Sequence, residues 1–447
     1  MGTTGTKEIE RSEPLIAVGI LPEQATISFS LLSGYTLNGK PLPTGDYRVE
    51  AGAAGVTFQG EQYPELTFEP EEMHRESFEL KEVIIGRNFH WERRENQRFQ
   101  GALKFIAEEK GITAINIVAL EDYLKSVISS EMSATSSEEL LKAHAVISRS
   151  WLLAQMEKNR VIDAGYQTSF VTPTEIIRWY DREEHARYDV CADDHCQRYQ
   201  GITRQTTGLV NKVIEATRGE VITYQHAICD ARFSKCCGGA MERFENVWEP
   251  IDHPYLQGKA DWTKGAAFPD LTQEEQADEW IRSAPPAYCN TQDAAILRQV
   301  LNDYDRETAD FYRWKVVYTQ EELSTLIRER SGIDFGEIIA LEPLERGSSG
   351  RIIRLKIIGT ERVMIIGKEL EIRRTLSPSH LYSSAFVVDA EEEDSEGIPQ
   401  RFTLTGAGWG HGVGLCQIGA AIMAAEGQNH EAILLHYFPH TTIEKRY

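Results

Sequence analysis

The chain has 447 residues, of which 41% are hydrophobic and 26% are charged, and its formal net charge is -22. This length allows two or three domains or one large composite unit, and the composition is ordinary for a globular protein with a sizeable core. The acidic balance argues against a nucleic-acid partner, which needs a basic surface. An anionic ligand would need a local basic pocket, because the net charge of the chain repels it.

The start of the sequence reads MGTTGTKEIERSEPL, and residues 1–13 are expected to form a flexible tail. This stretch lacks the apolar segment of a signal peptide, so the chain is either cytosolic or has lost such a segment. We predict no membrane span, because the sequence contains no run of 18 or more apolar residues.

Residues 14–115 predict a β-rich N-terminal region, because apolar and polar residues alternate between turns marked by Gly, Asn and Pro. The period changes from residue 116. Apolar residues then recur with the spacing of an amphipathic helix, which ends near Glu131. The members of this stripe are Leu120, Tyr123, Leu124, Val127 and Ile128.

A second helix is predicted from Ser136, which forms a capping-box pattern with Glu139, through about Met156. Its inner stripe consists of Leu140, Ala143, Ile147 and Trp151. Lys142 and Arg149 lie two turns apart on a different face, and we expect both to face the same cleft as Glu131.

The rest of the chain alternates between strand and helix patterns. Residues 200–260 indicate mixed strand and loop, 270–332 indicate helix, and strands return in RIIRLKIIG, RVMIIG and SAFVVDA. An acidic loop is expected at 391–400, followed by two short helices. The sequence therefore predicts an α+β fold with local strand clusters rather than a βαβ series.

The stretch GAGWGHGVG places a glycine at every second position from Gly406 to Gly414. In an extended segment these glycines would leave one face bare, so that another backbone or a flat ligand could come close. Trp409 and His411 would project from the opposite face, and Gln417 follows closely. The alternative is a tight, glycine-rich structural corner.

Glu131 is a candidate general acid, because a partly desolvated carboxyl at a helix end has a raised pKa. The alternative is a solvated helix-end carboxylate, since the chain has 69 acidic residues. Lys142 and Arg149 have the same alternative of solvated helix charges.

A third group of residues, in HARYDVCADDHC, has the side chains of a zinc site. His185, Cys191, His195 and Cys196 fall within twelve residues, although their spacing differs from that of a regular zinc finger. The alternatives are a Cys191–Cys196 disulfide or inert thiols. The stretch SKCCGG (234–239) is a second possibility, but neighbouring cysteines chelate one ion poorly and its glycines suggest a turn.

Several of these stretches occur in a fixed order: LEDYLKSVISSEM, LLKAHAVISRSW, FSKCCGGAMERFENVW, SGRIIRLKIIG and GWGHGVGLCQIGAAIMAAEG. Together they resemble the sporulation stage II protein D family, which includes the amidase enhancers of bacterial cell walls. The resemblance covers about 116–447, as one catalytic region with strand clusters and helices around a long cleft. The family usually has small hydroxyl residues where this chain has Cys236 and Cys237.

The resemblance implies a lytic transglycosylase that cuts peptidoglycan glycan strands, preferably without stem peptides, and a location in the cell envelope. It implies Glu131 as the catalytic acid, and a zinc ion, more structural than catalytic, held by His185, Cys191 and Cys196, with His195 or water as fourth ligand. The implied substrate-binding residues are Lys142, Arg149, Ser234, Trp409, His411 and Gln417.

The chemistry agrees with a single carboxylate, because the nucleophile in such a reaction is the C6 hydroxyl of the sugar itself. Glu131 would protonate the glycosidic oxygen and then take the C6 proton, which leaves a 1,6-anhydro product. In this interpretation His411 and Gln417 bond sugar hydroxyls or position the helix of Glu131. Two other functions remain open: a non-catalytic glycan-binding enhancer of a cell-wall amidase, and a zinc-stabilised structural or adaptor protein.

Overall fold

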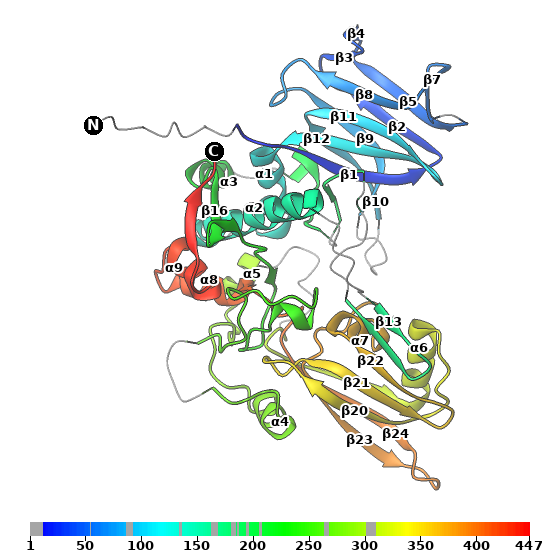
Figure 1. Ribbon diagram of the computed structural model, residues 1–447, viewed down its shortest axis with the longest axis vertical. Coiled ribbons are helices and arrows are strands. Elements are labelled where there is room, and N and C mark those ends of the chain that lie inside the picture. The colour runs from blue at the N-terminus through cyan, green and yellow to red at the C-terminus, as the bar shows by residue number, and fades with distance from the viewer. Residues whose placement is uncertain are drawn as a thin grey trace.

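The computed structural model describes residues 12–53, 55–85, 93–133, 136–161, 169–179, 185, 187–193, 196–204, 208–262, 268–300 and 310–447. These ranges form three tiers: N-terminal sheets at one end, a helical middle part, and a second group of sheets at the other end (Figure 1). The predicted α+β class with a β-rich N-terminal part is confirmed.

Two sheets build the N-terminal tier. The first has the spatial order β15 (Val190–Cys191), β1 (Leu15–Gln24), β12 (Gly111–Ala119), β11 (Ala102–Glu108), β8 (Glu65–Pro70), β3 (Tyr35–Leu37) and β4 (Lys40–Leu42). The second has the order β10 (Arg93–Gln100), β9 (Ser77–Ile85), β2 (Thr26–Leu31), β5 (Gly45–Gly52), β6 (Gly55–Phe58) and β7 (Glu61–Tyr63).

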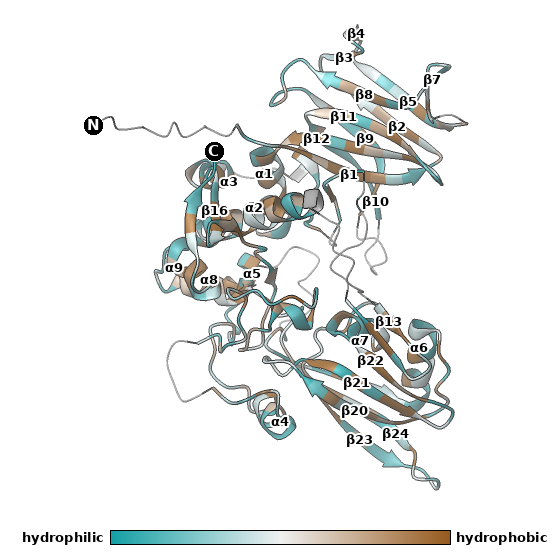
Figure 2. Cartoon of the chain, viewed as in Figure 1, coloured by the Kyte–Doolittle hydropathy of each residue, from teal (hydrophilic) through white to brown (hydrophobic). Residues whose placement is uncertain are grey.

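The two sheets enclose an aromatic core. The ring of Phe29 in the second sheet lies 5.1 Å from that of Phe68 and 5.3 Å from that of Phe105, both in the first sheet. All three side chains are fully buried. Apolar and polar residues alternate along several of these strands (Figure 2), as expected for strands with one face in a core.

The N-terminal sheet is continuous with the part that carries the candidate site. The predicted boundary between residues 115 and 116 falls inside β12, which leads directly into the first helix. The strand β1 pairs with β12 along one edge and, in parallel, with β15 along the other, where Gly19 lies opposite Cys191. A residue of the predicted zinc group is therefore part of the N-terminal sheet.

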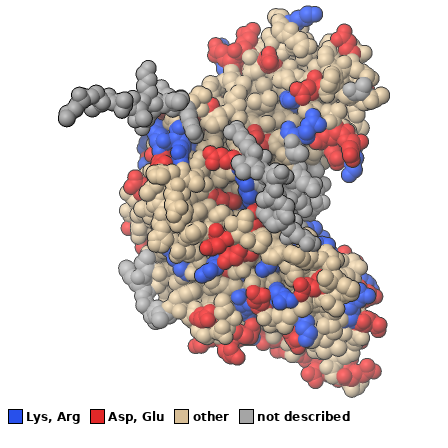
Figure 3. Space-filling view, viewed as in Figure 1, with Lys and Arg blue, Asp and Glu red and all other residues tan. Residues whose placement is uncertain are grey.

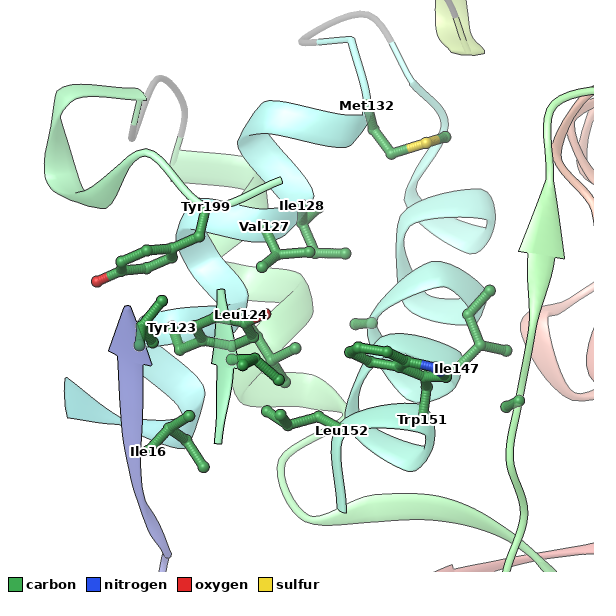
Figure 4. Packing of buried hydrophobic residues seen from close by; sticks show 14 of the residues in the cluster. Ile16, Tyr123, Leu124, Val127, Ile128, Met132, Ile147, Trp151, Leu152 and Tyr199 are labelled. Atoms are coloured by element: carbon green, nitrogen blue, oxygen red, sulfur yellow. The ribbon is translucent and has the colours of Figure 1, made fainter. Parts of the chain in front are cut away.

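The middle tier is built around α1 (Leu120–Glu131) and α2 (Glu138–Val161). Side chains of both helices, among them Leu124, Ile128, Trp151 and Leu152, gather in one buried cluster (Figure 4). Around them lie α3 (Gly208–Ala216), α5 (Ala294–Val300), α8 (Gln417–Ala425) and α9 (His430–Tyr437). Short strands complete this tier: β16 (Glu220–Tyr224), β17 (Ala227–Ile228) and β26 (Thr442–Lys445) in one sheet, and β18 (Phe233–Ser234) with β25 (Leu415–Cys416).

The third tier has its own core. One sheet has the order β13 (Ser169–Val171), β14 (Glu175–Arg178), β22 (Val363–Gly367), β21 (Ile352–Gly359) and β20 (Ile338–Arg346), and the other has β19 (Arg313–Thr319), β24 (Pro399–Ala407) and β23 (Phe386–Glu393). The helices α6 (Gln320–Ser331) and α7 (Glu369–Thr375) pack on these sheets, while α4 (Glu274–Ser283) lies beside β23 and β24. Their apolar residues form a main cluster and a small second one around α4, both separate from the cluster of the first two tiers.

The structure confirms both predicted helices of the middle tier and corrects two other expectations. The segment 270–332 is not helical throughout, because β19 lies within it and pairs along its whole length with β24. The stretch 391–400 is the tip of the β23–β24 hairpin, and its first and last residues belong to the strands. The predicted long cleft stays a prediction.

Two surface properties bear on the partners of the chain. On the face seen in Figure 3, acidic and basic side chains lie interspersed, so the negative charge is not confined to one tier of this face. Among the helices of the described ranges, none combines the length and the apolar character that a membrane crossing requires.

Candidate catalytic and metal-binding site

Glu131 is the last residue of α1, and its side chain is half-buried. The backbone N–H of Arg198 donates a hydrogen bond of 3.0 Å to its Oε1. The helix is anchored behind it, because Tyr123, Leu124 and Val127 are fully buried. Glu131 is therefore a carboxylate at the end of a fixed helix, oriented by a backbone donor from a distant loop.

The loop that orients Glu131 is itself attached to both helices. Gln197 accepts a hydrogen bond from the hydroxyl of Tyr123 in α1 (3.2 Å) and donates one to the carbonyl of Ser148 in α2 (3.3 Å). The N–H of Gln200 donates to Ser126 Oγ in α1 at 3.1 Å. These bonds fix the loop 196–200 against the helix that ends in Glu131.

The same loop begins with a predicted metal ligand. The donor atoms of His185, Cys191 and Cys196 all lie within 4.8 Å of one another, with Cys196 Sγ 3.4 Å from His185 Nε2. Cys191 and Cys196 are thiols, so the structure does not form the alternative disulfide. A hydrogen bond with Cys191, followed by burial, raises the pKa of Cys196 well above its usual value. One imidazole and two thiols within 4.8 Å of one another are a donor set that suits zinc. His195 lies outside the described residues.

The expectation that Arg149 meets the substrate is wrong. Its side chain is fully buried, and its guanidinium binds both carboxylate oxygens of Glu121 at 3.0 and 2.7 Å. A third hydrogen bond, of 3.0 Å, goes to the carbonyl of Glu220. The helix face that the sequence suggested was polar is covered by β16, so Arg149 connects α2 to α1 and to this strand.

Lys142 lies nearer the start of α2 and is partly exposed. Its ammonium contacts the carboxylates of Glu138 at 2.9 Å and Glu139 at 2.8 Å. The hydrogen bond with Glu139 is the main reason that the pKa of Lys142 is raised. Burial alone would raise the pKa of Glu139, but bonds from Lys142 and His430 lower it to about 2. Lys142 is therefore a partly neutralised cation.

The glycine stretch is not an extended strand beyond Ala407. Its last four glycines all have positive φ, between 73° and 92°, so the chain coils through a left-handed loop. At Gly412 a Cβ would lie 2.5 Å from the guanidinium carbon of the buried Arg351, which donates hydrogen bonds to the carbonyls of Gly410 and Cys237. The glycines therefore serve left-handed backbone and close packing, which is the structural alternative.

His411 and Trp409 differ in what they can offer a ligand. His411 Nδ1 accepts from the N–H of Val413 (3.0 Å), so Nε2 carries the proton and donates to the carbonyl of Phe233 (2.8 Å). Burial, followed by the charges of Arg232 and Arg351, holds the pKa of His411 well below its usual value. Both ring nitrogens are occupied, which corrects the expectation of direct hydroxyl binding. Trp409 is half-buried and packs on Phe311 and Tyr382.

Gln417 is buried beside the residue that follows α1. It is 2% exposed, and its Nε2 lies 2.9 Å from His144 Nε2 and 3.7 Å from the sulfur of Met132, the residue after Glu131. Of the two roles that the sequence suggested, the geometry favours support of the helix of Glu131. Ser234 is 6% exposed, and within the described residues its Oγ has no hydrogen-bond partner.

Two groups of residues that bear on the candidate sites were not predicted from the sequence. Arg198 and Gln197 act through the backbone and through long-range contacts, for which the sequence carries no signal. The second group consists of Cys237, Asp261, Cys289 and Cys416, whose donor atoms also lie within 4.8 Å of one another. Its signal was the unusual cysteine pair in SKCCGG, but the partners lie far away in the sequence.

Comparison with known proteins places these residues in a family context. Residues 108–224 match the stage II sporulation protein family, and residues 242–414 match a domain family of unknown function, DUF8618. An uncharacterized protein of Brachyspira hyodysenteriae is 26% identical over 340 residues, which cover 76% of this chain and 70% of the relative.

Two relatives come from Bacillus subtilis. Its stage II sporulation protein D is 24% identical over 334 residues, which cover 74% of this chain and 76% of the relative. Its amidase enhancer is 23% identical over 341 residues, 72% of this chain, but the match spans only 40% of the enhancer. The predicted resemblance to the sporulation stage II protein D family is therefore confirmed, and residues 108–224, which include Glu131 and the His185–Cys191–Cys196 group, carry it.

Proposed function

We propose that this chain is a peptidoglycan lytic transglycosylase of the cell envelope, which cleaves glycan strands to 1,6-anhydro products with Glu131 as general acid and base. The observation that carries the proposal is the bond from the Arg198 N–H to Glu131 Oε1, because it fixes a half-buried carboxylate at a helix end. A positioned carboxyl group is what proton transfer to a leaving oxygen needs.

The proposed reaction needs no second carboxylate. Glu131 donates its proton to the glycosidic oxygen as the bond from C1 to that oxygen breaks. The C6 hydroxyl of the same sugar attacks C1, and Glu131 takes the proton that this hydroxyl loses. The internal nucleophile replaces the activated water of an ordinary glycosidase and gains from its high effective concentration.

Zinc at His185, Cys191 and Cys196 would act on Glu131 indirectly. One nitrogen and two sulfurs within 4.8 Å fit zinc, and the ligand Cys196 is two residues from Arg198. When bound, the ion would supply a cross-link between β15 and the loop 196–200. The residues of this loop, not the ion, hold Glu131 in place.

The substrate contacts are proposed from two partly exposed residues, Trp409 and Lys142, and from one buried hydroxyl. Trp409 offers a ring edge for a sugar, and Lys142 offers a cation for lactyl carboxylates on strands without stem peptides. Ser234 Oγ is a buried hydroxyl with hydrogen-bonding capacity left over among the described residues. We assign Arg149, His411 and Gln417 to holding the elements that carry these groups.

The Glu131→Gln variant tests the proposal. The amide keeps the shape of the side chain but has no transferable proton, so product formation should fall by about 10²- to 10⁴-fold. The measurement is the release of 1,6-anhydro muropeptides from amidase-treated sacculi, with bound protein quantified in parallel. Glu275→Gln, at an exposed position of α4, is the matched control and should keep full activity.

The name of one relative, amidase enhancer, favours a second function, in which the chain binds glycan and stimulates a cell-wall amidase. In that case wild type and Glu131→Gln bind sacculi equally and neither releases anhydro products. A chain that binds no glycan at all supports the structural or adaptor function instead. Unchanged product release by a folded Glu131→Gln variant would remove Glu131 as the acid.

A further inference from the structure

We infer that Cys237, Asp261, Cys289 and Cys416 form a second, fully enclosed zinc site that is independent of the group beside Glu131. The four residues come from four separate segments: the loop after β18, the loop before α4, the loop between α4 and α5, and the end of β25. Their exposed fractions are 2%, 0%, 1% and 0%.

The spacing of the donor atoms matches a tetrahedral ion. Cys237 Sγ lies 3.5 Å from Cys289 Sγ and 3.2 Å from Asp261 Oδ2, and the donor atoms of all four residues, Cys416 Sγ included, lie within 4.8 Å of one another. With zinc–sulfur bonds of about 2.3 Å, two sulfurs of a tetrahedron lie about 3.8 Å apart. A disulfide would need about 2.05 Å. Cys237 and Cys289 therefore stand near the separation of co-ligands rather than that of a bonded pair.

Asp261 is the observation that separates this group from an ordinary cluster of buried thiols. Thiols pack as small apolar groups, but a carboxyl group without access to water is costly unless a cation or several donors compensate it. Asp261 is 0% exposed, and the polar atoms beside its carboxylate are His436 Nε2 and Cys237 Sγ, each at 3.2 Å. A cation between the carboxylate and the three sulfurs would remove this cost.

The surroundings of Asp261 also have the form of a metal ligand's outer shell. His436 Nε2 lies 3.2 Å from Oδ1, while Oδ2 is the oxygen that meets Cys237. A ligating carboxylate is commonly held in this way, with one oxygen on the ion and the other on a supporting group. The backbone is fixed too, because the N–H of Asp261 donates to Gly239 and its carbonyl accepts from Tyr288.

Cys236 is the competing ligand, since its thiol also reaches Cys289 and Cys416. Its backbone, however, is bonded in both directions to Trp409, at 3.0 and 2.8 Å, which fixes it against the glycine loop. Neighbouring residues rarely both bind one ion, and Cys237 is the one within reach of Asp261. We therefore assign three thiolates and one carboxylate, and the three thiolates are soft donors that select zinc over magnesium or calcium.

The site would be structural, because four protein ligands leave no coordination position open. Its effect on the rest of the molecule runs through Cys416, which is the N-cap of α8 and precedes Gln417. Gln417 contacts Met132 and His144, so the ion would fix the start of the helix that supports the end of α1.

The test measures the zinc content of the full chain, purified with reductant and without chelator. Wild type should hold about two equivalents, and the double variant Cys191→Ser/Cys196→Ser about one. In that background, Cys289→Ala should lose the remaining equivalent. Cys229→Ala, which removes a buried thiol outside both groups, and Cys236→Ser should each keep it.

Cobalt binding gives a second readout that does not depend on the folding of Cys289→Ala. Cobalt added to the metal-depleted Cys191→Ser/Cys196→Ser variant should give the intense charge-transfer bands of several thiolates, and Asp261→Asn should weaken its hold against a competing chelator. A chain without zinc or cobalt signal in that background, or a Cys237–Cys289 disulfide in the peptide map, overturns the inference. Loss of the ion from Cys236→Ser overturns the assigned ligand set. None of these results depends on glycan cleavage.

Discussion

The two metal-type groups of this chain contrast in exposure and in placement. His185, Cys191 and Cys196 are half-buried and lie close together in the sequence, next to the loop that touches Glu131. The second group is fully buried and joins residues that are up to 179 positions apart, as between Cys237 and Cys416. One group belongs to the edge of the candidate site, and the other lies inside the core of the middle tier.

Because of this difference, the loss of each group should have a different effect, although the two groups contain similar ligands. A partly exposed group on a loop can be lost without opening a core, so its loss should appear mainly in the position of Glu131. A buried group that connects four segments has no water to replace the ion, so its loss should appear mainly in stability. The comparison would fail if variants of the first group mainly lost stability and variants of the second group mainly changed the position of Glu131.

The largest expected effect is the loss of stability in Cys289→Ala. If the second ion is present at about a thousand times its dissociation constant, its loss removes about 4 kcal/mol from the free energy of unfolding. Urea titration followed by tryptophan fluorescence measures this change. Cys229→Ala should cost about 1 kcal/mol, and equal costs for the two variants would contradict a metal role for Cys289.

The contact between α1 and α2 can be tested without changing a residue of either metal-type group. Arg149→Met leaves the buried carboxylate of Glu121 without a cation, with only the N–H of Gly219 and the hydroxyl of Tyr447 as donors, which should destabilise the chain by about 3 kcal/mol. Lys142→Met in the same helix removes a partly exposed pair and should cost at most about 1 kcal/mol. A destabilised Lys142→Met beside an unaffected Arg149→Met would show that the buried pair does not hold the helices.

For the first group we expect a loss of activity rather than of stability. Cys196→Ser should lower the release of anhydro products by about 10- to 100-fold, because it removes support from the loop that orients Glu131. Its effect on the urea midpoint should be smaller than that of Cys289→Ala. Full activity in a variant shown to lack this ion would separate the group from the candidate site.

The smallest expected effect is a pH dependence that arises from His144. Burial lowers the pKa of His144 from 6.5 to about 3, so the folded chain binds fewer protons than the unfolded chain between these values. Stability is therefore complete above about pH 6.5 and falls by up to about 1.4 kcal/mol per pH unit below it.

His144→Gln removes this contribution, so its stability should fall less steeply between pH 6.5 and 5 than that of wild type. Urea midpoints across this range provide the measurement. His226→Gln changes an exposed histidine and should leave the slope as it is. An identical slope in His144→Gln would mean that His144 is accessible to protons in the folded chain.

Local sequence patterns determined the helices and the first metal-type group. The apolar stripes of α1 and α2 have the period of a helix, and a helix with such a stripe packs on its neighbours in a predictable way. His185, Cys191 and Cys196 are near one another in the chain, so only a short loop separates them. The apolar stripe of α1 also predicted that Glu131 lies at the end of a helix, and in the structure Glu131 is the last residue of α1.

Tertiary structure alone decided which polar residues face water and which distant residues meet. Nothing in the helical period of α2 distinguishes Arg149 from Lys142. In the folded chain, however, β16 and Glu121 cover Arg149, whereas Lys142 stays partly exposed. The alternating glycines suggested an extended strand, yet the buried Arg351 and the backbone of Arg232 fit only against left-handed glycine. The pairing of Cys237 with Asp261, Cys289 and Cys416 needs three loops and the end of β25 to converge, and that convergence is a property of the folded core that no local pattern encodes.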